Sequence, residues 1–195
     1  MECLAGFLFL MGNAAMSEED YTAAISYYQK LLRDSDFKRE TKKGEAPIKF
    51  AGTISPLAPD AQYKIAECYK KMSDGTKSDR DRVLAEYAKC AERFPQSYYS
   101  AKARFKIGNI YYQMKEFPRA LEFYMKFLRD QDYGGNFIDL ILMNIGKCRI
   151  KTKDYKGAAT IFNVIINDHP ESEHVETAQR ILNYISKMLK DGQAR

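Results

Sequence analysis

The chain has 195 residues, of which 45% are hydrophobic and 13% aromatic, and it contains no tryptophan. This apolar content excludes a disordered chain, and the length is enough to bury a substantial core. The net charge of +5 comes from 31 basic and 26 acidic residues that are interspersed, which favours an ordinary solvated surface over a nucleic-acid-binding one.

The first predicted element is a helix over residues 4–16, where apolar side chains recur at helical spacing. This apolar run is too short to span a bilayer, and Glu2 stands where a signal peptide would have basic residues. A polar turn follows, and then a second helix over 21–32. Its expected apolar face is made of Ala24, Ile25, Tyr28, Leu31 and Leu32. We therefore expect a helical hairpin over 3–34.

The next segment, 37–58, breaks the helical pattern, because Pro47, Gly52 and Pro56 would each stop a helix. We interpret it as an insertion that is either functional or disordered, as loops of this length usually are. It is rich in basic residues: Lys38, Arg39, Lys42, Lys43 and Lys49.

Helical periodicity resumes and predicts two-helix hairpins over 59–94, 99–130 and 137–168. The first of these contains a second, shorter insertion at 73–79, and its second helix is expected from Arg80. Either Ser97 or Ser100 could cap the helix that follows. A last helix, 172–190, has no partner after it and suits a terminal cap.

A small residue in the first helix of a hairpin recurs twelve residues before a small residue in the second helix. This spacing occurs three times, at Gly12 and Ala24, at Gly108 and Ala120, and at Gly146 and Ala158. Larger side chains at these places would push the two helices apart. The spacing therefore predicts one hairpin repeated along the chain.

These residues resemble the tetratricopeptide repeat (TPR) family, whose signature places small and apolar residues at fixed positions within about 34 residues. Three stretches match it: Ile107-Gly108, Tyr111, Ala120 and Tyr124; Ile145-Gly146, Ala158, Phe162 and Pro170; and Met11-Gly12, Ala24 and Tyr28. A fourth, with Ile65-Ala66, Tyr69, Tyr87 and Pro95, matches if its loop adds about five residues. The family's usual Trp is absent, and Arg149 replaces a Tyr in the last copy.

The resemblance implies an all-α fold, a right-handed α-solenoid of about four TPR-like helical hairpins plus a C-terminal capping helix, forming a single domain over 1–195. The stretch around Pro95-Gln96-Ser97 is further similar to a bacterial cell-envelope subgroup of the family, of the barrel-assembly lipoprotein and division-coordinator type. That similarity is an analogy of sequence only.

The family's geometry also implies that the first helices line a concave wall. The partner-binding residues it implies are Tyr63, Lys70, Lys102, Phe105, Asn109, Tyr112, Met143 and Lys147. The same wall would include Phe9, Asn13, Glu67 and Lys151. Aromatic side chains flanked by lysines suit a peptide that carries acidic residues. Several of the residues could instead be ordinary packing inside the repeat.

Catalysis and cofactor binding have no support in the sequence, because no nucleophile elbow, phosphate-binding loop or metal-binding motif is present. We therefore expect no enzyme activity, cofactor or metal. The four cysteines Cys3, Cys68, Cys90 and Cys148 form no CxxC pair and lie in apolar stripes, which predicts buried free thiols.

The sequence thus predicts a non-catalytic protein–protein interaction scaffold that binds a protein or peptide in a concave groove. Two alternatives stay open: a regulatory or docking domain of a larger enzyme, and a nucleic-acid-binding helical repeat that uses the lysine-rich insertion. The chain begins almost inside its first helix, as a piece excised from a longer protein would. Its compartment is therefore open between the cytoplasm and the periplasm or envelope, and its partner and oligomeric state are open too.

Overall fold

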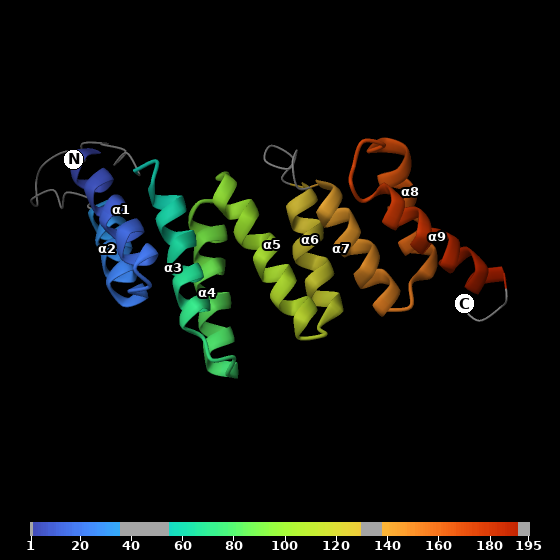
Figure 1. Ribbon diagram of the computed structural model, residues 1–195, viewed down its shortest axis with the longest axis horizontal. Helices are drawn as coiled ribbons and strands as arrows, with labels where there is room; N and C mark the ends of the chain where they lie inside the picture. The colour runs from blue at the N-terminus through green and yellow to red at the C-terminus, as the bar shows by residue number, and fades with distance from the viewer. Residues whose placement is uncertain (1, 36–54, 130–137, 191–195) are drawn as a thin grey trace, which may run out of the picture. The chain divides into compact units, whose positions relative to one another are not determined.

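The computed structural model describes residues 2–35, 55–129 and 138–190, and over these residues it contains nine helices and no strand (Figure 1). The helices are α1 Glu2–Ser17, α2 Tyr21–Ser35, α3 Ala58–Met72, α4 Lys77–Arg93, α5 Tyr98–Gln113, α6 Phe117–Arg129, α7 Ile138–Lys151, α8 Tyr155–Asp168 and α9 Val175–Lys190. The predicted fold class, an all-α arrangement of solenoid-type helical hairpins, is confirmed. Residues 37–54 of the predicted insertion lie outside the described residues.

The chain divides into two compact units, Met1–Ser100 and Ala101–Arg195. The first holds α1 to α4 and the first turn of α5, and the second holds the rest of α5 and α6 to α9. The single-domain organisation expected over 1–195 stays a prediction.

In the first unit, α2 packs against both α1 and α3, and α3 packs against α4. The predicted apolar face of α2 is confirmed, since all five of its residues are buried. Helix α4 begins at Lys77 and not at Arg80, because the Thr76 hydroxyl accepts a hydrogen bond from the Asp79 backbone N–H at 3.2 Å and caps the helix earlier. Ser97 caps α5, accepting from the Ser100 backbone N–H at 3.0 Å.

In the second unit, α7 packs between α6 and α8, and α9 packs on α8. Ala178 and Ile185 of α9 are fully buried in a cluster with Ala158, Phe162 and Ile165 of α8. Helix α9 therefore covers the last hairpin, as predicted for a cap.

Three of the hairpin turns share one backbone geometry. The second residue after the helix is in the left-handed region, with φ of 61° at Glu19, 61° at Lys115 and 64° at Lys153. The next residue donates its backbone N–H to a carbonyl five residues back, over 2.8–2.9 Å, in the pattern of a Schellman motif: Asp20 to Ala15, Glu116 to Tyr111, and Asp154 to Arg149. The α3–α4 turn instead places Gly75 at φ 89°.

Three of the four cysteines have side chains that the structure describes, and these three behave as predicted. Cys68, Cys90 and Cys148 are buried free thiols. Burial raises the pKa of Cys68 and of Cys148 to about 11, so both remain protonated and unreactive near neutral pH.

Candidate functional site

Three of the described hairpins are closed by an aromatic ring of the second helix that lies on a glycine of the first helix. A Cβ atom built on Gly108 would be 2.6 Å from Cε1 of Tyr124, and one built on Gly146 would be 2.5 Å from Cζ of Phe162. Tyr124 and Phe162 are themselves at most 1% exposed, so the rings cannot move away. Glycine is required at these two positions by close approach.

The residue that follows the small one is held by the hydroxyl of the same ring. Tyr28 donates its hydroxyl to Asn13 Oδ1 at 2.9 Å, and Tyr124 donates to Asn109 Oδ1 at 2.6 Å. Tyr87 donates in the same way to the Glu67 carboxylate. Burial raises the pKa of all three tyrosines, so each hydroxyl remains a donor.

The last hairpin changes both partners of this hydrogen bond. Phe162 has no hydroxyl, and Lys147 occupies the position of Asn13, Glu67 and Asn109. A lysine ammonium only donates hydrogen bonds, so it could not accept from a tyrosine. The side chain of Lys147 is therefore not oriented by the ring above it.

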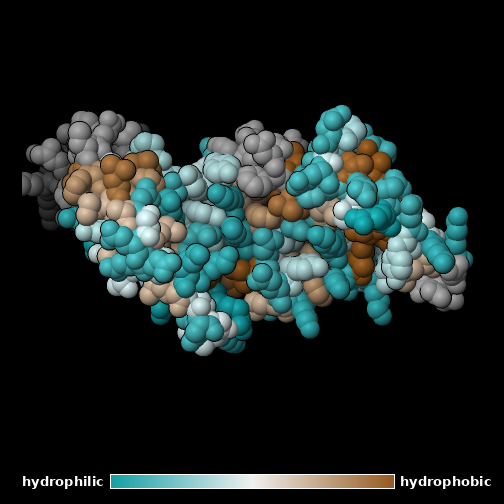
Figure 2. Space-filling view, viewed as in Figure 1, coloured by the Kyte–Doolittle hydropathy of each residue, from teal (hydrophilic) through white to brown (hydrophobic). Residues whose placement is uncertain are grey.

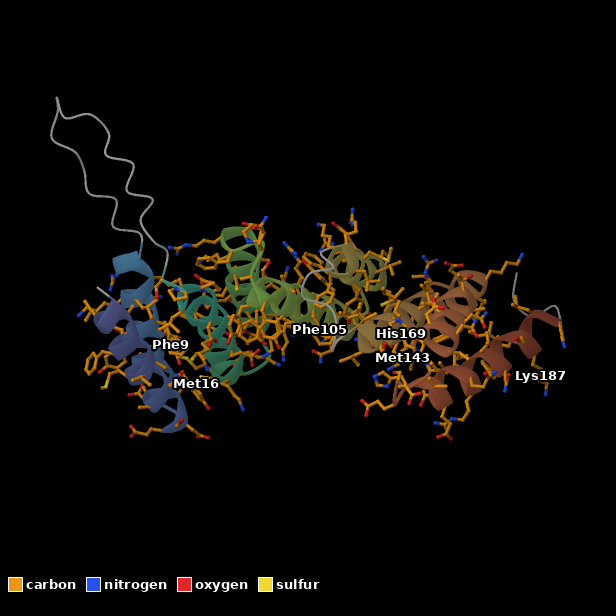
Figure 3. All side chains as sticks on the ribbon, turned by 90° about the horizontal axis from the view of Figure 1, so that it is seen from above. Phe9, Met16, Phe105, Met143, His169 and Lys187 are labelled. Carbon is orange, nitrogen blue, oxygen red and sulfur yellow. The ribbon has the colours of Figure 1, made fainter. Side chains whose placement is uncertain are left out.

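Four of the predicted partner-binding residues lie together with α7 in the second unit. Asn144 Nδ2 donates to Asn109 Oδ1 at 3.5 Å, which joins α7 to α5. Phe105 and Tyr112 of α5 pack against a buried cluster that contains Ile141, Ile145 and Cys148 of α7. The resulting surface, here called the α5–α7 face, consists of Lys102, Phe105, Asn109, Tyr112, Asn144 and Lys147, all half-buried. Figure 3 shows Phe105 on α5.

The aromatic side chains of the α5–α7 face are held in place by other rings. The centroids of Phe105 and Tyr124 are 6.1 Å apart, and the ring of Tyr112 meets Phe117 edge-on at 5.4 Å. Burial raises the pKa of Tyr112, which keeps its hydroxyl neutral. Both rings thus offer a rigid apolar edge.

The charge of the α5–α7 face is basic. Its charged members are Lys102 of α5 and Lys147 of α7, and α5 carries no acidic residue. In the first unit, α3 is mixed, with Asp60 and Glu67 among its lysines. A surface that combines half-buried rings, amides and lysines can bind a chain with apolar and acidic side chains.

The structure places the other predicted residues differently. Met143 is 2% exposed and packs in the cluster of α7, α8 and α9, so it offers no surface (Figure 3). Tyr63 is 6% exposed, and its ring lies 5.5 Å from Tyr87 and 5.7 Å from Tyr99 in the first unit. Lys70 is exposed on α3. Asn144 was not among the predicted residues, and its only sequence signal is its position one helical turn before Lys147. The partner-binding role of the predicted residues stays a prediction.

Within the described residues, neither a metal site nor a membrane span is found. Among the described residues no three His, Cys, Asp or Glu side chains come together as metal ligands. In the same residues, every helix is too short or too polar to cross a bilayer. His169 Nδ1 lies 2.9 Å from Asp139 Oδ1, a contact between the end of α8 and the start of α7.

Sequence comparison assigns the repeats. Two family models described as tetratricopeptide repeat match residues 60–97 and 141–172, and residues 5–33 and 101–129, which together are well over half of the chain. The chain belongs to the tetratricopeptide repeat family. TPR repeats generally mediate protein–protein interactions, and TPR proteins are generally non-catalytic scaffolds. No curated protein sequence matches the chain.

Solved TPR-like structures share this fold at low sequence identity. A tetratricopeptide repeat protein from Parabacteroides merdae matches with a TM-score of 0.66 and 13% identity over 94% of this chain and 60% of its own. The apo form of RapI matches with a TM-score of 0.64 and 16% identity, over 92% of this chain and 46% of its own. BtubC from P. vanneervenii matches with a TM-score of 0.63 and 16% identity, over 98% of this chain and 75% of its own. The chain thus spans less than two thirds of the first two proteins, and the envelope subgroup stays a prediction.

Proposed function

We propose that this chain is a non-catalytic interaction module that binds an acidic peptide segment of a partner protein on the α5–α7 face. The observation that carries the proposal is the combination on one face of half-buried rings, two amides and lysines. Acidic side chains of the partner would meet Lys102 and Lys147, and its apolar side chains would cover Phe105 and Tyr112.

The rigidity of the face favours binding. Phe105 and Tyr112 are fixed by ring contacts, and Asn109 is fixed by the Tyr124 hydroxyl. Side chains that are ordered before binding lose little conformational entropy when a partner arrives. Aromatic anchors of this kind often dominate the binding energy of an interface.

The test is a selection of peptides from a random library on the purified chain, followed by affinity measurement. Selected peptides should be rich in Asp and Glu next to an apolar residue. Their affinity should fall at least tenfold for the Phe105→Ala and Tyr112→Ala double variant, since about 1.4 kcal/mol is tenfold and each anchor is worth about that much or more. Circular dichroism of the variant would verify that it is folded.

Charge reversal gives a second, milder variant. Lys102→Glu with Lys147→Glu should weaken the same peptides and flatten the salt dependence of binding, because the lost contacts are electrostatic. The matched control is Lys187→Glu on α9, which is exposed and lies off the face. Selected peptides without acidic residues, or binding that both variants retain, would refute the proposal.

Experiments can distinguish the proposed peptide binding from the two alternative functions that the sequence left open. The lysine-rich insertion lies outside the described residues, so nucleic-acid binding is tested by titrating single-stranded RNA and DNA at low salt, where we expect no binding. A docking role within a larger enzyme would also use an interaction surface, and the same variants would then lower docking of that enzyme's other part.

A further inference from the structure

Helix α1 exposes a row of large apolar side chains to solvent. Leu4 is 48% exposed, Phe7 57% and Leu10 67%, and Ala14 continues the row. We call these four residues the α1 stripe. The spacing of three and four residues places them along one side of the helix. Figure 2 shows the hydrophobic colours gathered over α1 and α2, at the left of the view.

The equivalent side of α3 is covered. Alignment of Gly12 with Ala66 sets Leu4 opposite Ala58, Phe7 opposite Ala61, Ala14 opposite Cys68, and Leu10 opposite Lys64, which is half-buried. Ala58, Ala61 and Cys68 are all fully buried, in a helix that packs against α2. In the first unit the first helix of a hairpin thus buries this side against the second helix of the hairpin before it.

Helix α7 repeats the arrangement inside the second unit. Alignment of Gly12 with Gly146 sets Phe7 opposite Ile141 and Ala14 opposite Cys148, while Leu4 and Leu10 lie opposite the half-buried Ile138 and Asn144. Ile141 and Cys148 are fully buried in a cluster that includes Phe127 of α6. Two independent hairpins therefore show what covers this side of a first helix, namely an amphipathic second helix.

Helix α1 also has the composition of a covered helix. Glu2 is the only charged residue within Glu2–Ser17, so the helix is apolar on nearly every side. A helix of that kind is normally buried all round. One side of α1 packs on α2, and the α1 stripe is left for another element. Exposed apolar surface of this size commonly marks an interaction site.

We propose that the α1 stripe docks an amphipathic helix of a partner protein, one that presents leucine and phenylalanine side chains as α6 presents them to α7. A second copy of this chain is not well suited to supply it. Three of its second helices, α2, α6 and α8, already have α3, α7 and α9 packed against them. This site lies in the first unit and is separate from the α5–α7 face.

The proposed site can be probed directly with a fluorescently labelled peptide that has the α6 sequence, residues 117–129, and uncharged, blocked termini. We expect it to bind the full chain, measured by fluorescence anisotropy, and a scrambled peptide of the same composition not to bind. Phe7→Asp with Leu10→Asp should weaken binding at least tenfold. Leu10→Asp alone changes a side chain that is 67% exposed, so this variant remains folded and should weaken binding about threefold.

The matched control is Tyr184→Asp on α9, since Tyr184 is 63% exposed and lies off the stripe. It should leave binding unchanged. The proposal would be overturned by absence of binding at millimolar peptide, or by equal binding to wild type and the stripe variants. Sedimentation velocity is the third arm: we expect a monomer, and a dimer that the stripe substitutions dissociate would show that a second copy covers the site.

Discussion

The hairpins α5/α6 and α7/α8 make the same ring-on-glycine contact but differ beside the ring. In α5/α6 the ring of Tyr124 lies on Gly108, and its hydroxyl reaches Asn109. In α7/α8 the ring belongs to Phe162, and Lys147 stands where the acceptor would be. The packing contact is therefore the same in both hairpins. The hydrogen bond is not, because its donor and its acceptor are both present in α5/α6 and both absent in α7/α8.

This difference separates what closes a hairpin from what orients its surface. The ring fills the space over glycine in both hairpins, so it holds the helices together. The hydroxyl acts on the residue after glycine, which belongs to the α5–α7 face. Where the hydroxyl is missing, that residue is a lysine that can turn toward a ligand.

The largest effect should come from removing the rings. Tyr124→Ala and Phe162→Ala should each lower the free energy of unfolding by about 3–5 kcal/mol, because each leaves a large cavity in the core. Urea unfolding followed by circular dichroism measures both. Similar losses would support a shared role, and a loss in one hairpin only would break the comparison.

Filling the space over the glycines should cost less. Gly108→Ala and Gly146→Ala should each destabilise by about 1–2 kcal/mol, since overpacking costs about 1–3 kcal/mol and alanine regains up to about 1 in helix propensity. The control is Gly6→Ala, where the added Cβ meets no atom within 4 Å. Gly6→Ala should instead raise the free energy of unfolding by up to about 1 kcal/mol. Destabilisation by all three variants would contradict the role of close approach.

The hydrogen bond itself should be worth about 1 kcal/mol. Tyr124→Phe removes it and should lower stability by that amount. Phe162→Tyr should also be destabilising, because its hydroxyl would enter a fully buried site that lacks an amide acceptor such as Asn109, and adding Lys147→Asn should recover the loss. A double-mutant cycle on these two positions measures the coupling, and zero coupling would show that the paired change is incidental.

The smallest effect concerns the turn before α8. The pKa of Asp154 is lowered by the hydrogen bond from the Gly157 backbone N–H and by Arg149. Its contribution is therefore present above the unfolded carboxyl pKa of about 3.9 and is lost as pH falls through the lower folded value. Because the group is largely exposed, the effect should stay below about 1 kcal/mol. Asp154→Asn keeps the cap and should remove this pH dependence of Tm, whereas an unchanged profile would point to another group.

Much of the fold could be predicted because periodicity and small residues report directly on packing. The apolar face of α2, the small residue under each ring and the cap α9 all follow from spacing. The start of α4 was placed too late, because the Thr76 cap acts through one side chain and leaves no periodic signal. The hydroxyl bonds to Asn13, Glu67 and Asn109 were missed since their two partners are far apart in sequence. Met143 was predicted to lie on a surface because helical position alone cannot reveal that it packs in the cluster with residues of α8 and α9.

The α3–α4 connection has a practical consequence for protein engineering. Tyr87 follows Ala66 by 21 residues, whereas the equivalent ring follows its glycine by 16 in the other hairpins, yet Tyr87 still bonds to Glu67. Residues 74 and 75 of this turn are exposed and precede Thr76, which caps α4. A reporter or affinity tag could therefore be inserted after Asp74. The three Schellman turns allow no such addition, because one extra residue would break the hydrogen bond that spans five residues and displace the left-handed residue.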